Sequence, residues 1–172
     1  RHAGEPRLTR LRTDPRKQSE REGLIDLPMT CFSGGTLEIY IEPHFPLPRL
    51  LVIGNLPVAQ ALVQLGKAMN YNVIAVDPDN EGAGLAQADE LLTDLAQIVD
   101  KITPLTYVVV ASHGHYDELA LTTVLRSKAA YVSLVTSQTR AETVVAYLKA
   151  QGLTGEELSR LKYRAGLDIR AQ

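Results

Sequence analysis

Residues 50–77 read LLVIGNLPVAQALVQLGKAMNYNVIAVD, and this stretch decides the fold. An apolar run ends at Gly54, apolar residues at helical spacing follow, and a second apolar run, 73–76, ends at Asp77. This order predicts a strand, a tight turn, a helix and a parallel strand. In such a unit the helix N-terminus at the turn can bind a phosphate, and the acid after the second strand can accept a hydrogen bond from a ribose hydroxyl.

The glycine fingerprint of dinucleotide-binding turns, GxGxxG, is incomplete here. Its three glycine positions fall on Gly54, Leu56 and Ala59. Ala59 is small enough for close packing of the helix on the strand, but Leu56 puts a branched side chain where a pyrophosphate would approach the backbone. Pro57 suits a first helical turn, and it removes one backbone donor. The stretch predicts a Rossmann-type unit and leaves open whether it binds NAD(P), another ligand or nothing.

Composition and charge exclude several classes of protein. The chain has 172 residues and is 45% hydrophobic, which is enough for one sizeable core. Its formal net charge of −2 argues against a general nucleic-acid binder. The chain also contains no run of eighteen apolar residues, which is the length needed to span a membrane. One cysteine excludes an internal disulfide, and no signal-peptide pattern occurs, so we expect a cytoplasmic protein. Because the sequence opens on Arg1, we expect a processed or truncated chain.

The N-terminal part of the chain has a different character. Residues 1–22 carry seven Lys and Arg against four Asp and Glu, which predicts a solvated arm, with a docking surface as the alternative. Apolar and polar residues alternate over 37–41, the pattern of a strand with one buried face. A proline-rich connector, 43–48, follows. We therefore assign an N-terminal arm and strand to 1–48 and a Rossmann-like domain to 49–172.

The remainder of the chain continues the alternation of strands and helices. After Asp77 we expect a loop at 78–84, a weak helix or turn region to residue 100, strands at 106–111 and 130–134, and helices at 118–126, 141–149 and 154–163. The predicted fold class is α/β. Specifically, we expect a three-layer Rossmann-like fold with a parallel sheet, preceded by a small N-terminal arm with one β-strand.

Polar residues follow three of the predicted strands, at Gly54, at 112–117 and at 136–140. Because the carboxyl ends of parallel strands meet at one edge of a sheet, we expect these turns to converge on one crevice. His113, His115 and Asp117 are of the types that ligate zinc or another transition metal. Helix capping by the aspartate, or binding of an organic ligand, are the alternatives that the residues leave open.

Cys31 is the only thiol, and it lies beside Gly34 and Gly35. A free cysteine is usually a small buried hydrophobic residue. Two glycines also allow a turn that leaves the sulfur accessible, where a thiolate could hold a soft metal or a persulfide. The chain has no recognisable catalytic triad, Walker loop or pair of acid–base carboxylates, so enzymatic activity is left open.

Several stretches in succession resemble the xanthine dehydrogenase accessory (XdhC/CoxI) family. They are MTCFSGGTLEIYIEP, PRLLVIG, VVVASHGHYDELALTTVLRS, YVSLVTSQTRAETVVAYLKAQGLTGEELSRL and AGLDI, and they cover about residues 29–170. The combination is specific, and the chain resembles a shortened or divergent member. The resemblance implies an accessory factor for a molybdenum hydroxylase of the xanthine or carbon monoxide dehydrogenase type, which binds the molybdenum cofactor for sulfuration and inserts it into the apoenzyme.

The resemblance also supplies candidate site residues. The candidate cofactor-binding residues are Cys31, Gly34, Gly35, Gly54, Asn55, Asp77, His113, Asp117, Ser137 and Asp168. Of these, Cys31 is the candidate for contact with molybdenum or sulfur. The chain departs from the family pattern at Leu56, Ser133 and Thr136, where glycines are usual.

The implied partners are a molybdenum hydroxylase apoenzyme, a cysteine desulfurase and a second copy of the chain, with no nucleic acid and no membrane. A cofactor chaperone is therefore expected more than a catalyst. Two alternatives stay open, namely an NAD(P)-binding Rossmann oxidoreductase and a ligand-free protein-interaction module.

Overall fold

The computed structural model describes residues 6–13, 24–30, 35–79 and 83–163. The chain divides into two compact units, Arg1–Pro46 and Leu47–Gln172, and each is considered by itself. In these described ranges no helix has both the length and the apolar character needed to cross a membrane.

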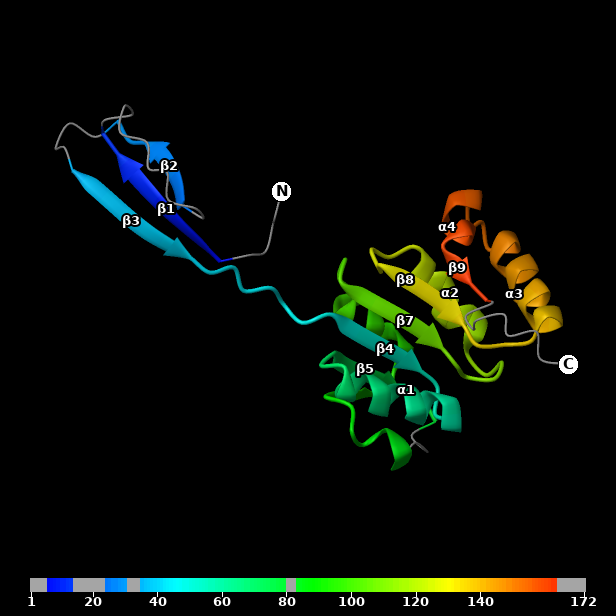
Figure 1. Ribbon diagram of the computed structural model, residues 1–172. Helices are drawn as coiled ribbons and strands as arrows, with labels where there is room; N and C mark the ends of the chain where they lie inside the picture. The colour runs from blue at the N-terminus through cyan, green and yellow to red at the C-terminus, as the bar shows by residue number, and fades with distance from the viewer. Residues whose placement is uncertain (1–5, 14–23, 31–34, 80–82, 164–172) are drawn as a thin grey trace, which may run out of the picture. The chain divides into compact units, whose positions relative to one another are not determined.

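The second unit is built on a six-stranded sheet in the order β6-β5-β4-β7-β8-β9 (Figure 1). Its strands are β4 (Arg49–Ile53), β5 (Asn72–Val76), β6 (Glu90–Leu92), β7 (Thr106–Val110), β8 (Tyr131–Leu134) and β9 (Leu161–Lys162). Every neighbouring pair is parallel. The chain builds outward from β4 to β6, returns to β7 beside β4, and then builds outward on the other side. The switch point of the sheet therefore lies between β4 and β7.

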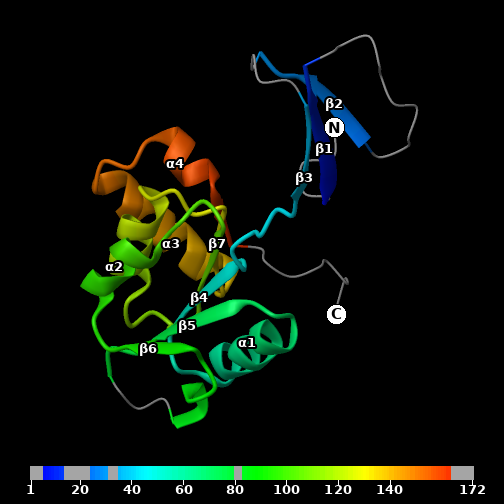
Figure 2. The same cartoon turned by 90° about the vertical axis from the view of Figure 1, so that its left-hand side faces the viewer.

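Helices cover both faces of this sheet, as Figure 2 shows. Helix α1 (Pro57–Ala68) lies on one face, and α2 (Asp117–Leu125) and α3 (Gln138–Ala150) lie on the other. The short elements are α4 (Gly155–Ser159) and the 3₁₀ helices η1 (Ala83–Leu85) and η2 (Leu95–Lys101). The prediction of a three-layer Rossmann-like fold with a parallel sheet is confirmed.

Buried apolar side chains form two clusters, one on each face of the sheet. Val52, Val73 and Ala75 pack with the residues of α1, whereas Ile53 and Val110 face the helices on the other side. Because both faces are covered, the central strands are apolar at nearly every position. This is why the runs at 50–53, 73–76 and 106–111 are readable as strands from the sequence alone.

Helix α1 lies unusually close to the sheet at Gly66. A β-carbon at this glycine would lie 2.7 Å from Cδ2 of Leu50 and 2.9 Å from Cγ2 of Val73. Ala59, the position that the sequence indicated for close packing, is also fully buried. Two small residues, two turns apart, therefore set the distance between helix and sheet.

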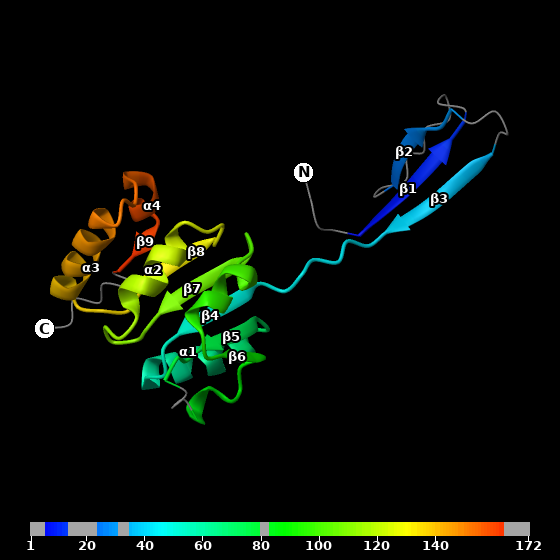
Figure 3. The ribbon, with the colours of Figure 1, turned by 180° about the vertical axis from the view of Figure 1, so that it is seen from behind.

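The first unit is a three-stranded sheet in the order β2-β1-β3, with β1 in the middle (Figure 3). The strands are β1 (Arg7–Arg12), β2 (Leu24–Pro28) and β3 (Thr36–Ile41). The strand predicted at 37–41 is confirmed and has two further strands beside it, so the expectation of a solvated arm is wrong for 7–12. Arg10 pairs with Glu38 on β3 at 2.5 Å. Cross-strand pairs of opposite charge allow this basic segment to form a strand.

One face of this small sheet is apolar and exposed. Leu37, Ile39 and Ile41 are 49%, 38% and 51% exposed, so the predicted burial of this side of the strand is wrong. In the pairing register, Thr9 of β1 lies opposite both Ile25 and Ile39. Residues opposite one another in a sheet share a face. The exposed apolar side chains of β2 and β3 therefore lie on the same face.

Two short strands of the second unit were not predicted. Strand β6 lies in the region expected to be helix or turn, and β9 follows α4, which ends at Ser159 and does not run to Tyr163. Strands of two or three residues are too short to show a period in the sequence. The predicted stop of α3 is confirmed, because Gly152 follows that helix in the left-handed region with φ +79°.

Candidate functional site

Three strand-to-helix turns lie at the carboxyl edge of the parallel sheet. They are the β4–α1 turn (54–56), the β7–α2 turn (111–116) and the β8–α3 turn (135–137). Strands β4, β7 and β8 are consecutive in the sheet, so the turns are neighbours. These are the three turns that the sequence predicted to share one edge.

The β4–α1 turn packs directly against the end of β7. Gly54 has φ +121°, and a β-carbon there would lie 2.2 Å from the carbonyl oxygen of Ala111. Its amide donates to the carbonyl of Val76 at 2.9 Å. Both the backbone conformation and the close approach require a glycine. The fold therefore explains Gly54 without a phosphate.

Asn55 and Asp77, two predicted site residues, contact each other. Nδ2 of Asn55 donates to Oδ1 of Asp77 at 3.1 Å, and the aspartate is fully buried. The amide of Asp77 also donates to the carbonyl of Leu92 at 2.9 Å. This acid joins the ends of β5 and β6 to the β4–α1 turn, and a ribose would have to displace Asn55 to reach Oδ1.

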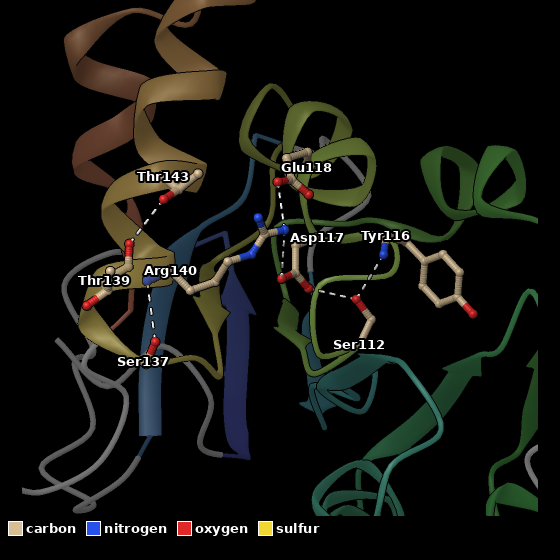
Figure 4. Close-up of polar contacts among 8 residues, drawn as sticks. All are labelled: Ser112, Tyr116, Asp117, Glu118, Ser137, Thr139, Arg140 and Thr143. Atoms are coloured by element: carbon tan, nitrogen blue, oxygen red, sulfur yellow. Dashed lines mark hydrogen bonds and ion pairs between the residues drawn. The ribbon is translucent and has the colours of Figure 1, made fainter.

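A buried polar network holds the β7–α2 turn (Figure 4). Oγ of Ser112 donates to Oδ1 of Asp117 at 2.7 Å and accepts from the amide of Tyr116 at 3.1 Å. Ser112 and Asp117 are 5% and 1% exposed. A buried carboxylate is tolerated when charge and hydrogen bonds compensate it, and its place in the first turn of α2 also suits a negative charge.

Arg140 supplies the compensating charge from the neighbouring helix. Its Nη2 lies 2.7 Å from Oε1 of Glu118 and 3.7 Å from Oδ2 of Asp117. Figure 4 shows the guanidinium reaching from α3 toward the two carboxylates on α2. The amide of Arg140 donates to Oγ of Ser137, which caps α3, at 3.3 Å. The first turns of α2 and α3 are thus joined by an ion-pair cluster, Asp117–Glu118–Arg140.

A polar cavity of about 570 Å³ lies beside this cluster. Its lining residues are His113, Val135, Thr136, Ser137 and Arg140. They come from the β7–α2 turn and from the β8–α3 turn with the start of α3. His113 has φ +55°, a conformation in which side chains other than glycine are uncommon. The predicted residues His113 and Ser137 therefore line one cavity, whereas neither Gly54 nor Asp77 is among its lining residues.

A second cavity, of about 600 Å³, adjoins the first and shares Val135 and Thr136 with it. Its other lining residues are Val58, Leu62, Val109, Tyr131, Ser133, Leu134, Gln138 and Tyr163. The walls are largely apolar and come from α1, β7 and β8. The sheet edge thus carries a polar compartment and an apolar one side by side.

The two histidines of the β7–α2 turn have different surroundings, because His113 lines the polar cavity and His115 contacts Asp79. Nδ1 of His115 lies 3.5 Å from Oδ2 of Asp79, and Tyr116 donates a hydrogen bond to the same carboxylate. Asp117 is instead engaged by Ser112 and Arg140. Across the described ranges, no group of three or more His, Cys, Asp or Glu residues could hold a metal ion. The metal interpretation of His113, His115 and Asp117 is therefore wrong for this arrangement.

Three predicted site residues, Cys31, Gly34 and Asp168, lie outside the described residues. Gly35, which follows Gly34 in the sequence, begins the described range 35–79. It has φ +113°, and no atom lies within 4 Å of the position that a β-carbon would take there. That backbone conformation favours glycine.

Arg140 and Glu118 are the site residues that the sequence did not single out. The signal was weak, because a charged residue in the first turn of a helix is ordinary. The pairing of Glu118 with Arg140 can be recognised only once the strand order places α2 beside α3. Strand order depends on long-range contacts and cannot be read from the local sequence pattern.

The comparisons with known proteins agree with this fold. The family model of the XdhC Rossmann domain matches residues 50–172. A curated relative, uncharacterized protein YqeB of Escherichia coli (strain K12), is 23% identical over 148 residues, which are 81% of this chain and 27% of YqeB.

A crystal structure of a xanthine dehydrogenase from Bacillus halodurans superposes with a TM-score of 0.61 at 22% identity. The match covers 91% of this chain and 45% of that chain. This likeness is one of fold. The chain thus spans about a quarter of the length of YqeB and less than half of the chain in that crystal structure.

Proposed function

Because this chain belongs to the XdhC family through its Rossmann domain, we propose that it is an accessory protein for the maturation of a molybdenum hydroxylase. Its cargo is the molybdenum cofactor, a pterin that carries a phosphate. The work of the protein is to bind and shield this cargo, to keep it available for sulfuration and to release it to the apoenzyme. Turnover of a substrate is not part of the proposal.

The observation that supports cargo binding is the polar cavity between the β7–α2 and β8–α3 turns. Its volume of about 570 Å³ lies within the range of small-molecule sites. An arginine, two hydroxyl residues and a histidine line it. Such groups suit a ligand with an anionic tail and hydrogen-bonding ring edges. Ligands of doubly wound sheets bind at this edge, and the cavity lies one strand away from the switch point between β4 and β7.

We assign the contact with the molybdenum or sulfur of the cofactor to Cys31, because of the family resemblance. A thiolate can hold a soft metal or carry a persulfide. A cysteine desulfurase would supply the sulfur, and the molybdenum hydroxylase apoenzyme would receive the finished cofactor. We extend the proposal to a homodimer working in the cytoplasm, where a thiol stays reduced.

The test is retention of the cofactor by the purified chain. The chain is mixed anaerobically with molybdenum cofactor, passed through a gel-filtration column and analysed for molybdenum, with NAD and NADP run in parallel. Cys31→Ala and Cys31→Ser are the matched variants, since serine keeps the size of the side chain without the thiolate. We expect the wild-type chain to retain molybdenum and both variants to lose it. Retention of NAD(P) in place of molybdenum would favour the oxidoreductase alternative.

A second candidate function, a ligand-free interaction module, is favoured by the exposed apolar face of the small sheet. Isolated exposed apolar residues are ordinary, whereas several on one face indicate a partner. The test is the affinity for a molybdenum hydroxylase apoenzyme without cofactor. Ile39→Asp, on the apolar face, is expected to weaken binding about tenfold. Tyr40→Asp, on the other face of the same strand, is the control and is expected to leave the affinity unchanged.

A further inference from the structure

The β4–α1 turn is occupied by contacts within the protein. The missing side chain of Gly54 is needed for the approach to Ala111, and Asp77 is buried against Asn55. Leu56 precedes the helix and makes no side-chain capping hydrogen bond. The glycine and the acid that serve a dinucleotide in such turns are therefore engaged by the protein itself here.

Arg140 lies at the other half of the sheet edge, and two of its guanidinium nitrogens have no acceptor among the described residues. Both carboxylates of the cluster contact the same terminal nitrogen, Nη2. Within the described part of the chain, no acceptor contacts Nε or Nη1 of this residue. Its side chain is 34% exposed and forms part of the wall of the polar cavity. The N–H groups of Nε and Nη1 therefore stay available as single hydrogen-bond donors, while the carboxylates hold the guanidinium plane in place.

The surroundings of these two donors suit an anionic oxygen group. Thr136, Ser137 and His113, two hydroxyl residues and an imidazole, line the same cavity. Gly114 lies beside the guanidinium, where a β-carbon would be 3.6 Å from Nη2, so no side chain covers it from that side. Guanidinium N–H groups form strong, charge-assisted hydrogen bonds with phosphate oxygens.

We propose that Arg140 binds the phosphate group of the ligand, and that the phosphate site of this domain lies at the β8–α3 turn and not at the β4–α1 turn. The inference rests on the proposed function only in assuming a phosphate-bearing ligand. Asp117 and Glu118 bring two negative charges to the one positive charge of Arg140. The site therefore binds a phosphate weakly by itself and gains affinity when a carboxylate is neutralised.

The experiment measures pyrophosphate binding to the full chain by calorimetry at low ionic strength. Arg140→Gln removes the charge, and Arg140→Lys keeps the charge but loses the separate donors Nε and Nη1. Glu118→Gln keeps the arginine and removes a competing carboxylate. Lys149→Gln, in the last turn of the same helix, makes the same change in net charge away from the cavity. Thermal unfolding of each variant checks that it is folded.

We expect Arg140→Gln to weaken pyrophosphate binding at least about tenfold, Arg140→Lys to weaken it about threefold, and Glu118→Gln to strengthen it about threefold. Lys149→Gln should match the wild-type chain. The inference is overturned if wild-type protein binds no pyrophosphate at millimolar concentration, or if folded Arg140→Gln binds it as well as wild type. It is also overturned if Glu118→Gln leaves binding unchanged.

Retention of molybdenum cofactor, measured on the same proteins, separates the two proposals. If wild type and Arg140→Gln retain the cofactor equally, the accessory function stands and the arginine site is wrong. If wild type retains no cofactor but binds pyrophosphate through Arg140, the anion site stands and the accessory function fails.

Discussion

Nη2 of Arg140 lies 2.7 Å from Oε1 of Glu118, and this ion pair joins the first turn of α3 to the first turn of α2. The two helices follow neighbouring strands of a parallel sheet, so the pair holds together the two turns that line the polar cavity. The cluster depends in turn on the hydrogen bond between Ser112 and Asp117 beneath it.

The buried serine gives the first prediction. Ser112→Ala removes the donor to Asp117, which is buried, and the acceptor for the amide of Tyr116, which is partly buried. We expect a loss of about 1 to 3 kcal/mol in the free energy of unfolding, measured by urea denaturation. Ser159→Ala, whose hydroxyl bonds to a carbonyl on the protein surface, is the control and should change stability by less than about 0.5 kcal/mol. Equal effects of both substitutions would contradict the network.

The turn glycine gives the second prediction. Gly54→Ala places a β-carbon against the carbonyl of Ala111 and requires alanine at φ +121°. We expect a loss of at least about 2 kcal/mol, measured by thermal or urea unfolding. Gly155→Ala is the matched control because nothing lies within 4 Å of its β-carbon position, and alanine is the better helix former. A Gly54→Ala protein as stable as wild type would refute the structural role of this glycine.

Much of the Rossmann unit was predictable from sequence, for reasons that the structure makes clear. The central strands are largely buried on both faces, so they are apolar at nearly every position, and Gly152 marks the end of α3. The parallel arrangement followed from the alternation of strands with helices along the chain. The predicted turns therefore fell at the correct edge.

What could not be predicted depends on long-range contacts. The strand at 7–12 needs the partners Asp26 and Glu38, which lie far along the chain. Asp77 was predicted to face a ligand, but it lies buried against Asn55. The local sequence pattern predicts that an acid lies at the end of a strand. It does not predict which side chain will form a hydrogen bond with that acid.

A third prediction concerns Arg160, which ties the end of the sheet to α2. Its guanidinium donates to the carbonyls of Leu125, Ser127 and Ala129 at 2.5, 2.9 and 2.7 Å. Two nitrogens of the guanidinium reach these acceptors, whereas a lysine has a single nitrogen and loses part of the set. We therefore expect Arg160→Lys to lower the unfolding free energy by about 1 to 3 kcal/mol. Arg126→Lys, an exposed position with one such bond, should have a smaller effect. A greater loss of unfolding free energy in Arg126→Lys than in Arg160→Lys would contradict the stabilising role of the Arg160 contacts.

A fourth prediction concerns acid stability. A hydrogen bond from Lys67, and a second from the amide of Val73, lower the pKa of Asp89 below its usual value of 3.8. A group with a lowered folded-state pKa stabilises the fold above its unfolded pKa, and this contribution is lost as the pH falls through the folded pKa. We therefore expect the unfolding free energy to fall below about pH 4, and to fall less steeply in Asp89→Asn.

Urea denaturation between about pH 2 and 6 measures this slope. Asp100→Asn, which removes an exposed acid, is the control for the change in surface charge. An Asp89→Asn protein with the same acid slope as wild type would show that the contacts with Lys67 and Val73 do not form in solution.

The central claim is that this chain carries the molybdenum cofactor, and the most direct measurement is molybdenum content after anaerobic loading and gel filtration. We expect about one molybdenum per chain in the protein peak, with NAD and NADP absent from it. A wild-type protein peak without molybdenum would contradict the claim.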